Sequence, residues 1–482
     1  MHGWKTLQVD GFSLWTNPRT KVTLSAAKAS GRVLFLGDPI DVDHAESRVT
    51  EIAEQISQTL DRLGPEEAVR QAAYLAGRWT MLLLHGQRQP SYSTFAQSPL
   101  CWIVPDTMGS QGSFYATTIK GFVYGSSPTL VAAAANLSRR KDLSAVTKEI
   151  KQLRPRGVTY LPGMMTPFAG VRPVMPNCLL EVDRRNPGAA THRRFWPWEE
   201  NQRTDDVATV YRDFRERFSA YLGLIAQRPK VGVSLTGGLD STTMLAHLYP
   251  HLRSSDFTFT YYNPKDSAPS AAADVFEANE LASRLGIQHR VLQWRNPSAD
   301  SPYAEIHRRV HPHLYASHGA AHAMWADLPR DFTHVNSLAG EIGTTMTRVR
   351  DYREPDPAWY ARFWLGDNFT TVKRYLDSFD RYLDYTDFSH ASLAGYDQHN
   401  VAYWELRIGK WGYGKFVDAD QSHRCIPAFN DRRLLEIMLR LPQEHLVGKA
   451  LYHATFADQP QFRPMFAPTD GRKTWVTGPT SL

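Results

Sequence analysis

The stretch VGVSLTGGLDSTTMLAHL, residues 231–248, determines how the second half of this chain folds. It begins with β-branched and apolar residues, passes through two glycines, an aspartate and several hydroxyl residues, and ends in apolar residues at helical spacing. This order predicts a buried β-strand, a tight loop and a helix. Packing alone does not require the polar centre, so we interpret it as a binding loop.

The composition of the loop predicts an anion site. Gly237 and Gly238 allow the backbone to curl so that consecutive N–H groups point into one concavity. The hydroxyls of Thr236, Ser241 and Thr242 add donors, and the following helix contributes its positive end. A site of this size suits a phosphate or a pyrophosphate.

Asp240 is the unexpected residue in this loop. A carboxylate repels a phosphate unless a hard cation such as Mg²⁺ lies between them, which is how Mg²⁺ is commonly shared with a nucleotide. No lysine follows the second glycine, so the loop is not a Walker A motif. A tight strand-to-helix turn with an aspartate or serine cap is the alternative.

The first 183 residues alternate short strands with turns, which is typical of an antiparallel layered domain. Helical spacing of apolar residues adds helices at residues 45–64 and 143–154. The predicted strands are residues 32–40, 78–86, 100–106, 112–125 and 177–183.

A segment rich in proline, arginine and polar residues, 184–206, is predicted to be a linker. An amphipathic helix over 207–227 follows, and then strands alternate with helices as far as the strand at 289–294. That alternation favours a parallel sheet with crossover helices. We therefore expect an α/β protein with two domains, 1–200 and 201–482.

The composition excludes several classes of protein. The 482 residues are 42% hydrophobic and 22% charged, as in soluble globular proteins. A net charge of +6 without a block of like charges does not imply nucleic-acid binding. No membrane-spanning run or secretory signal is visible, and Cys101, Cys178 and Cys425 are too far apart for a zinc cluster. We expect a cytoplasmic protein whose cysteines are buried.

The chain resembles the asparagine-synthetase family of ATP pyrophosphatases. Residues 236–241, TGGLDS, are similar to that family's Ser-Gly-Gly-x-Asp-Ser pyrophosphate loop, with Thr236 in place of the first serine. VTYLPGMMTPFAGVRPVMPNCLLEVD resembles the segment that closes the family's N-terminal domain, and HRCIPAFNDRRLLEIMLRLP resembles its C-terminal signature. The helix and strand in DVFEANELASRLGIQHRVL are also similar.

The resemblance implies an N-terminal glutaminase-like domain of the Ntn type, with αββα layers, followed by an ATP-pyrophosphatase domain. In asparagine synthetase a cysteine directly after the initiator methionine hydrolyses glutamine. The second residue here is His2. We therefore expect a glutaminase-like domain that is inactive, and a nitrogen source other than glutamine.

The activity implied by the resemblance is ATP- and Mg²⁺-dependent amide formation through an acyl-adenylate, with AMP and pyrophosphate as products. Without a glutaminase, the chain is most similar to members that close an intramolecular amide. We favour a lasso-peptide cyclase that joins the N-terminal amine of a processed precursor peptide to an Asp or Glu side chain and cooperates with a leader peptidase and a leader-binding protein. The alternatives are a β-lactam synthetase-like cyclase, an ammonia-dependent asparagine synthetase and a non-catalytic binding protein.

The resemblance also implies a second nucleotide loop, at LAGEIGTTMTR, where Gly340 and Glu341 match the family's Gly and Glu. Glu341 is expected to orient or deprotonate the attacking amine. Thr344 replaces a metal-binding Asp of the family, so Asp240 alone, water or Asp351 is left to complete the metal site.

Two further sets of residues follow from the resemblance. Leu235 and Thr260 are expected to flank the nucleotide with Gly340. The family uses a lysine near the C-terminus to stabilise charge on the acyl-adenylate. We assign this role to Lys473 in DGRKTWVTGP, with Lys449 as the alternative.

Overall fold

The structure, a computed structural model, describes residues 4–86, 99–119, 121–153, 160–183, 186, 188, 190–266, 269–310, 318–344, 350 and 352–464. The chain divides into two compact units, which we call unit 1 and unit 2. Unit 1 comprises Met1–Glu200, His307–Ala316 and Val349–Val417, and unit 2 comprises Asn201–Ile306, Ser317–Arg348 and Asp418–Leu482.

The main sheet of unit 1 has six antiparallel strands in the order β11-β10-β6-β5-β4-β3. Helix α1 (Val49–Leu63) packs against β4 and against α2 (Pro65–Ala73). The predicted strands and helices of this region are confirmed with shifted ends, except that the predicted strand 112–125 is a hairpin of two antiparallel strands, Phe114–Thr118 and Gly121–Gly125. The strands are β3 (Val22–Leu24), β4 (Gly31–Ile40), β5 (Ala76–Gly86), β6 (Pro99–Pro105), β10 (Cys178–Asp183) and β11 (Ala190–Arg194).

A three-stranded sheet, β8-β7-β9, lies on the other face of the main sheet. Side chains along β7 (Phe114–Thr118) point alternately to its two faces and show which face meets the main sheet. Tyr115 packs into the core of the main sheet, whereas Phe114 and Ala116 pack with Val131 of α3 (Pro128–Ala135). Unit 1 thus has helix, sheet, sheet and helix layers, and its assignment as a glutaminase-type domain stays a prediction. The remaining strands are β8 (Gly121–Gly125), β9 (Arg172–Pro173) and the ribbon β1 (Lys5–Val9) with β2 (Phe12–Thr16).

The predicted linker 184–206 is wrong in part, because it contains strand β11. The strand pairs with β10 at the edge of the sheet although its sequence, ATHRR, is polar. Its arginines have specific partners: Arg193 binds Glu181 of β10, and Arg194 forms a buried pair with Glu405. Composition does not reveal such partners.

The segment Val349–Val417 lies in unit 1, whereas the two predicted domains place it in the second. Its helices α11 (Pro357–Leu365) and α12 (Lys373–Tyr385) pack together. Tyr375 of α12 is buried against Val146 and Ile150 of α4 (Leu143–Leu153), which explains the assignment. The segment continues through α13 (Gln398–Ala402), a π-helix (Tyr403–Gly412) and α14 (Tyr413–Ala419).

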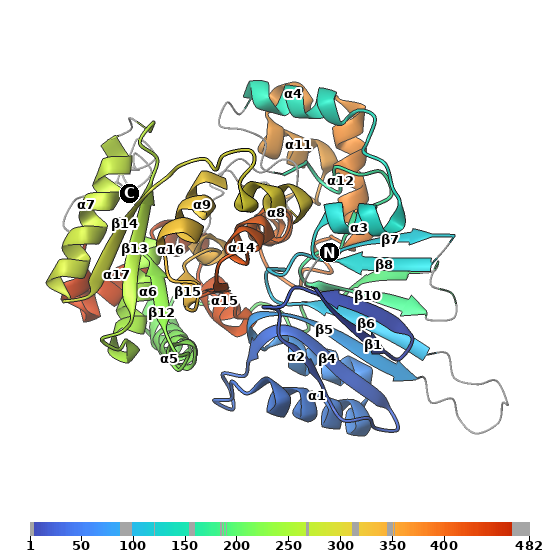
Figure 1. Cartoon of the computed structure of the whole chain (residues 1–482), viewed down its shortest axis with the longest axis horizontal. Helices are drawn as coiled ribbons and strands as arrows, with labels where there is room; N and C mark the ends of the chain where they lie inside the picture. Colours follow the sequence, from blue (N-terminus) through green and yellow to red (C-terminus); the bar gives the residue numbers. More distant parts are fainter. Residues whose placement is uncertain are drawn as a thin grey trace. The chain divides into compact units, whose positions relative to one another are not determined.

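Unit 2 is built on a five-stranded sheet in the order β14-β13-β12-β15-β16, and all four pairings are parallel. The predicted α/β class with a parallel sheet is confirmed. Figure 1 shows α7 (Pro269–Arg284) beside β13 and β14. The strands are β12 (Val231–Ser234), β13 (Phe257–Tyr262), β14 (Gln288–Gln293), β15 (Thr333–Asn336) and β16 (Arg424–Pro427).

The alternating Phe and Thr residues of β13 show which side chains lie on each face of this sheet. Phe257 and Phe259, two residues apart, pack against α9 (His318–Asp327) and Phe332. Thr258 and Thr260 occupy the other face. The remaining helices of unit 2 are α5 (Val207–Ala226), α6 (Leu239–Leu248), α10 (Gly340–Thr344), α15 (Arg432–Leu439), α16 (Gln443–Val447) and α17 (Ala450–Asp458), and α8 spans Pro302–Val310.

Two expectations from composition concern the whole chain. Cys101, Cys178 and Cys425 are buried and unbridged, as predicted. Among the helices that the structure describes, none combines the length and the apolar composition needed to cross a bilayer.

Candidate nucleotide site

The predicted binding loop follows β12, the strand at which the strand order of the parallel sheet of unit 2 reverses. From β12 the chain moves outward through β13 to β14, whereas β15 and β16 lie on the other side of β12. The loops that follow β12 and β15 therefore leave neighbouring strands at the same edge. Ligands of open α/β sheets bind at such a switch point. The two loops are the ones singled out in the sequence, residues 235–238 and 337–339.

The glycines of the first loop have no φ angle in the left-handed region, and at Gly237 a side chain would have little room. Gly238 has φ −77°, and Gly237 is not among the positive-φ glycines. A Cβ at Gly237 would lie 3.1 Å from Oδ1 of Asp274 and 3.1 Å from Cβ of Glu277, both on α7. A Cβ at this position would force its neighbours on α7 to shift by a few tenths of an ångström, which accounts for the glycine without the predicted curl.

The hydroxyls of the loop hold its own backbone. Ser241 Oγ accepts a hydrogen bond from Thr236 N at 3.1 Å and lies 3.1 Å from Thr236 O and from Gly238 O. Thr242 Oγ1 donates to Gly238 O at 3.1 Å, and Gly238 N donates to Thr236 Oγ1 at 3.1 Å. These hydroxyls therefore shape the loop in this structure, whereas the sequence assigned them to the ligand.

The backbone supplies the open donors. In the described part of the chain, the N–H groups of Gly237, Leu239 and Asp240 donate to no oxygen. The last two belong to the first turn of α6, where N–H groups lack a partner within the helix. Together with the positive end of a ten-residue helix they form an anion-binding arrangement.

Asp240 is held by two side chains near α17. Its Oδ1 accepts a hydrogen bond from the Tyr452 hydroxyl at 2.9 Å, and its Oδ2 lies 3.6 Å from Nζ of Lys449. The Asp240 side chain is 22% exposed and that of Lys449 is 32% exposed, so both remain accessible to a ligand. The predicted metal ligand and the alternative lysine therefore lie together.

The second loop approaches Asp240 closely at Gly340. A Cβ on Gly340 would lie 2.8 Å from Asp240 Oδ1 and 2.7 Å from the Tyr452 hydroxyl. Burial raises the pKa of Tyr452 well above its usual value, and the charges of Asp240 and Glu341 raise it further, whereas Thr344 has the opposite effect. Tyr452 is thus a neutral hydrogen-bond donor that both loops surround.

Unusual backbone conformations also mark this region. Among the described residues of unit 2, the non-glycine residues with positive φ are Ala339, at 78°, and Lys449, at 53°. Ala339 is the last residue before α10, and Lys449 directly precedes α17. Such conformations cost free energy and are concentrated at functional sites.

Leu235 and Thr260, predicted to flank the nucleotide, are bonded to each other. Thr260 Oγ1 donates to the Leu235 carbonyl at 2.6 Å and lies 3.2 Å from Nε2 of His289. Nδ1 of His289 lies 2.8 Å from Thr258 Oγ1. Burial lowers the pKa of His289 to about 4, so the ring is neutral at physiological pH. These residues fix the ends of β12 and β13 beside the loop.

The residues around Asp240 suit a Mg²⁺ ion that is shared with phosphates. Mg²⁺ prefers oxygen ligands and is commonly bound by one or two carboxylates together with a substrate's phosphates. Among the described residues, no side chain donates a hydrogen bond to Oδ2 of Asp240, and Nζ of Lys449 lies 3.6 Å from it. Thr344 Oγ1 donates to the Gly340 carbonyl at 3.3 Å. Among the described residues, Asp205, Glu444 and His445 lie close enough together to share an ion, and Asp240 is not one of this group.

Several predicted residues lie outside the described residues. Lys473, Asp351 and His2 are among them, so their predicted roles stay predictions. Sequence reasoning missed Tyr452 and His289. Tyr452 lies in the first turn of α17, and Lys449 is the left-handed residue directly before that helix, so helical spacing in the sequence does not link the two. His289 is revealed only by strand pairing, which sets it beside Thr258.

No family model matches this chain, and no curated protein matches its sequence. Similar solved structures include the glutamine-dependent NAD+ synthetase from Acinetobacter baumannii in complex with ADP (10% identity, 53% of this chain and 56% of that chain, TM-score 0.16). The NH3-dependent NAD synthetase from Campylobacter jejuni in complex with nitrate is similar at 12% identity over 42% of this chain and 96% of that chain, with a TM-score of 0.21.

The NMN synthetase from Francisella tularensis is similar at 14% identity over 54% of this chain and 99% of that chain, with a TM-score of 0.19. The chain thus spans little more than half the length of the A. baumannii enzyme. At these identities and TM-scores, the likenesses do not assign an activity to this chain.

Proposed function

We propose that this protein is an ATP-dependent ligase that adenylates a carboxylate and then forms an amide, with AMP and pyrophosphate as products. The observation that carries the proposal is the meeting of three features at the end of β12. These are the open N–H groups before and in the first turn of α6, the accessible carboxylate of Asp240, and Lys449 3.6 Å away. A pyrophosphate needs anion donors and a counter-charge in one place.

The reaction has two steps. A carboxylate oxygen of the substrate attacks the α-phosphorus of ATP, and the bond between that phosphorus and the bridging oxygen breaks, so pyrophosphate leaves. An amine nitrogen then attacks the acyl carbon, the acyl–phosphate bond breaks, and AMP leaves while the amine loses a proton. The N–H groups of Gly237, Leu239 and Asp240 bind the departing pyrophosphate in this proposal.

Four side chains assist these steps. Asp240, oriented by the Tyr452 hydroxyl, would hold Mg²⁺, and the bound ion would neutralise phosphate charge. The ammonium of Lys449 stabilises the charge that develops on the acyl-adenylate, a role supported by its distance from Asp240. Glu341, whose charge acts on Tyr452, accepts the proton of the amine. Lys473 remains the alternative lysine.

The substrate class follows from departures from the asparagine-synthetase pattern. His2 replaces the glutaminase cysteine, Glu341 stands where β-lactam synthetases have tyrosine, and Thr344 replaces a carboxylate that those enzymes keep. The resemblance implies a glutaminase-like domain that is inactive, and an intramolecular amine suits such a chain. We therefore propose a lasso-peptide cyclase that joins the N-terminal amine of a processed peptide to an Asp or Glu side chain and works with a leader peptidase and a leader-binding protein.

Product analysis tests this proposal. The full chain is incubated with ATP, Mg²⁺ and linear peptides that have a free N-terminus and one internal Asp or Glu, and peptide mass and AMP are measured. Loss of one water from the peptide with one AMP per product is the expected result. Peptides with Asn or Gln in place of the acid are the controls and are expected not to react. Formation of asparagine from free aspartate and ammonia, with every peptide unchanged, would overturn the cyclase assignment.

A further inference from the structure

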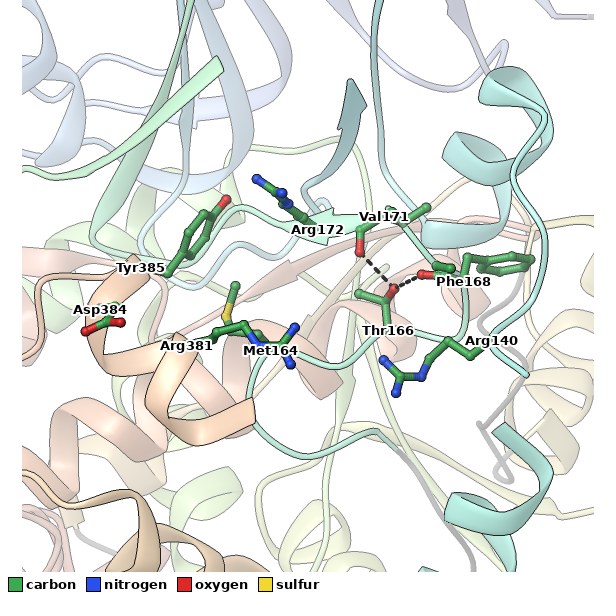
Figure 2. Close-up of a pocket in the computed structure, with 11 residues that line it drawn as sticks. Arg140, Met164, Thr166, Phe168, Val171, Arg172, Arg381, Asp384 and Tyr385 are labelled. Carbon is green, nitrogen blue, oxygen red and sulfur yellow. Dashed lines mark hydrogen bonds between the residues drawn. The ribbon is translucent and has the colours of Figure 1, made fainter. Parts of the chain in front are cut away.

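Unit 1 contains a cavity of about 500 Å³ that no residue of the nucleotide site lines. Three segments form it: the residue Arg140 before α4, the loop from Met164 to Arg172, and the last turn of α12. Figure 2 shows side chains from all three segments. This volume is within the range of about 300–1,000 Å³ typical of small-molecule sites.

Part of the cavity lining, which we call the wall, is apolar. Met164, Phe168, Val171 and the ring of Tyr385 line it. The polar atoms nearby are bonded within the protein: Thr166 Oγ1 donates to the carbonyls of Phe168 and Val171, at 2.9 Å each, and the Tyr385 hydroxyl lies 2.8 Å from that of Tyr115. This wall therefore favours an apolar group of a ligand.

Arginine side chains add positive charge to the cavity lining. In Figure 2 the guanidinium groups of Arg140 and Arg381 point toward one another below Thr166. Arg140 is paired with Asp142, at 3.0 and 2.8 Å. Arg381 forms no ion pair with a described carboxylate, and its Nε donates to a backbone carbonyl of its own helix. Guanidinium groups are well suited to carboxylates.

The net charge of the side chains around the cavity limits the charge of a ligand that can bind there. Arg172 adds a third guanidinium to the lining, and Asp384 is its one carboxylate. Since Asp142 neutralises Arg140, the cavity carries a small positive excess. Such an excess suits one negative charge and not a polyphosphate.

The loop that forms the wall is fixed by hydrogen bonds from a buried lysine. Nζ of the buried Lys410, in the π-helix, donates to the carbonyls of Leu161 and Met165, at 2.8 and 3.1 Å, and also to that of Gly163. Three bonds from one ammonium fix the backbone that leads into Met164 and Thr166. The wall is therefore formed before a ligand binds, which lowers the entropic cost of binding.

We propose that this cavity binds an organic monoanion, a carboxylate carried on an apolar body. The carboxylate lies between Arg140 and Arg381, and the apolar body packs on Met164, Phe168 and Val171. A free organic acid and the acidic residue of a peptide share this chemistry. None of the lining residues belongs to the nucleotide site, and the proposal does not depend on the ligase activity.

Calorimetric titration of the full chain tests this. The probes are 4-phenylbutyrate, its neutral counterpart 4-phenylbutanol, acetyl-Phe-Ala-Glu-amide and the same peptide with Gln in place of Glu. At least one carboxylate probe is expected to bind about tenfold more tightly than its neutral counterpart, since a charge-assisted hydrogen bond contributes roughly this much. A tighter peptide identifies a peptide ligand, and a tighter phenylbutyrate identifies a free acid.

Variants locate the binding. Arg381→Gln is expected to weaken the preferred probe about tenfold, and Ala169→Trp, which places an indole at the cavity lining, to abolish binding. Arg62→Gln, an exposed arginine of α1, is the control for loss of one charge and should leave affinity within about twofold. Equal binding of charged and neutral probes, absence of binding by both carboxylates, or unchanged affinity in Arg381→Gln would each overturn the proposal.

Discussion

Asp240 is the residue on which the proposed chemistry depends most directly. The structure gives it a hydrogen bond from Tyr452, a cation at 3.6 Å and a close neighbour in Gly340. A carboxylate that only capped a helix would not need a second loop and a second helix around it. Its surroundings therefore favour a role in ligand binding over the alternative of a simple turn.

Asp240→Asn tests that role. The substitution keeps the size of the side chain and the acceptor for Tyr452 but removes the negative charge. We expect at least about a hundredfold loss of ATP–pyrophosphate exchange and weaker dependence on Mg²⁺, because a neutral amide is a poor ligand for a hard cation. Asp300→Asn, at an exposed position of unit 2, is the control and should exchange normally. Full activity in Asp240→Asn would remove Asp240 from the site.

Lys449 and Lys473 are distinguished by a pair of methionine substitutions. If the ammonium beside Asp240 stabilises the acyl-adenylate, Lys449→Met loses about a hundredfold in rate with little change in KM, whereas Lys473→Met stays active. Lys265→Met, exposed in unit 2, controls for the loss of one lysine. The reverse pattern would return the role to Lys473.

Some residues of this site were predicted from the sequence, and others were not. The loop 236–242 and Gly340 were visible in the sequence because glycine and hydroxyl residues occur together after a strand. The direction of the hydroxyls and the place of Tyr452 were not, since each depends on which backbone or helix lies next to the loop. Residue types predict the kind of chemistry, and packing decides which atoms face the ligand.

At the scale of the element, helix α6 contains a buried histidine that links stability to pH. Nδ1 of His247 lies 3.0 Å from Ser219 Oγ, and Nε2 lies 3.3 Å from Thr455 Oγ1. Burial lowers the pKa of His247 from 6.5 to about 4, and Arg215 adds to the effect, while Asp458 opposes it. Between these pKa values the unfolded chain binds the proton and the folded chain does not.

The free energy of unfolding should therefore fall as pH decreases from about 6.5 to about 4, by up to about 3 kcal/mol from this residue, and then level off. Urea denaturation at several pH values measures it. In His247→Gln, which cannot titrate, the fall should be smaller by that amount. Identical pH dependence in the two proteins would contradict a neutral buried His247.

The π-helix of unit 1 contributes a buried carboxylate, Glu405, with three partners. Arg194 contacts it at 2.8 and 3.0 Å, the Tyr382 hydroxyl donates at 2.8 Å and the Asn177 amide donates at 3.0 Å. Glu405→Gln leaves the Arg194 charge without its counter-ion. We expect a loss of about 3–5 kcal/mol in stability, from the urea midpoint.

Asp377→Asn is the matched control, because Asp377 pairs with Lys373 on the exposed face of α12. Little change is expected there, since exposed ion pairs contribute little. A similar small change in Glu405→Gln would show that burial does not strengthen the pair.

Elements with strong periodicity were predicted well, and those set by distant partners were not. The strand 231–234 and the helix that follows were expected from the sequence, as was α5. Strand β11 was not, because its polar residues gain their partners from the preceding strand β10 and from α2 and the π-helix, which are distant in sequence.

At the scale of the molecule, the sequence indicated two domains and a parallel sheet but not the membership of residues 349–417. Periodicity shows that α12 has an apolar face and does not show what covers it. Besides α11, it packs on α4 of unit 1: Tyr375 shares a buried cluster with Val146 and Ile150, and its hydroxyl donates to Glu149. The strand order, which brings the two loops together, likewise depends on long-range pairing.

The central claim is that this chain activates a carboxylate with ATP. Exchange of radiolabelled pyrophosphate into ATP, measured with the full chain, Mg²⁺ and candidate carboxylate substrates, tests it most directly. Exchange that requires both the carboxylate and Asp240 is predicted, because pyrophosphate release is reversible until an amine captures the adenylate. Absence of exchange with every peptide and amino acid tried, from a chain that binds ATP, would contradict the account.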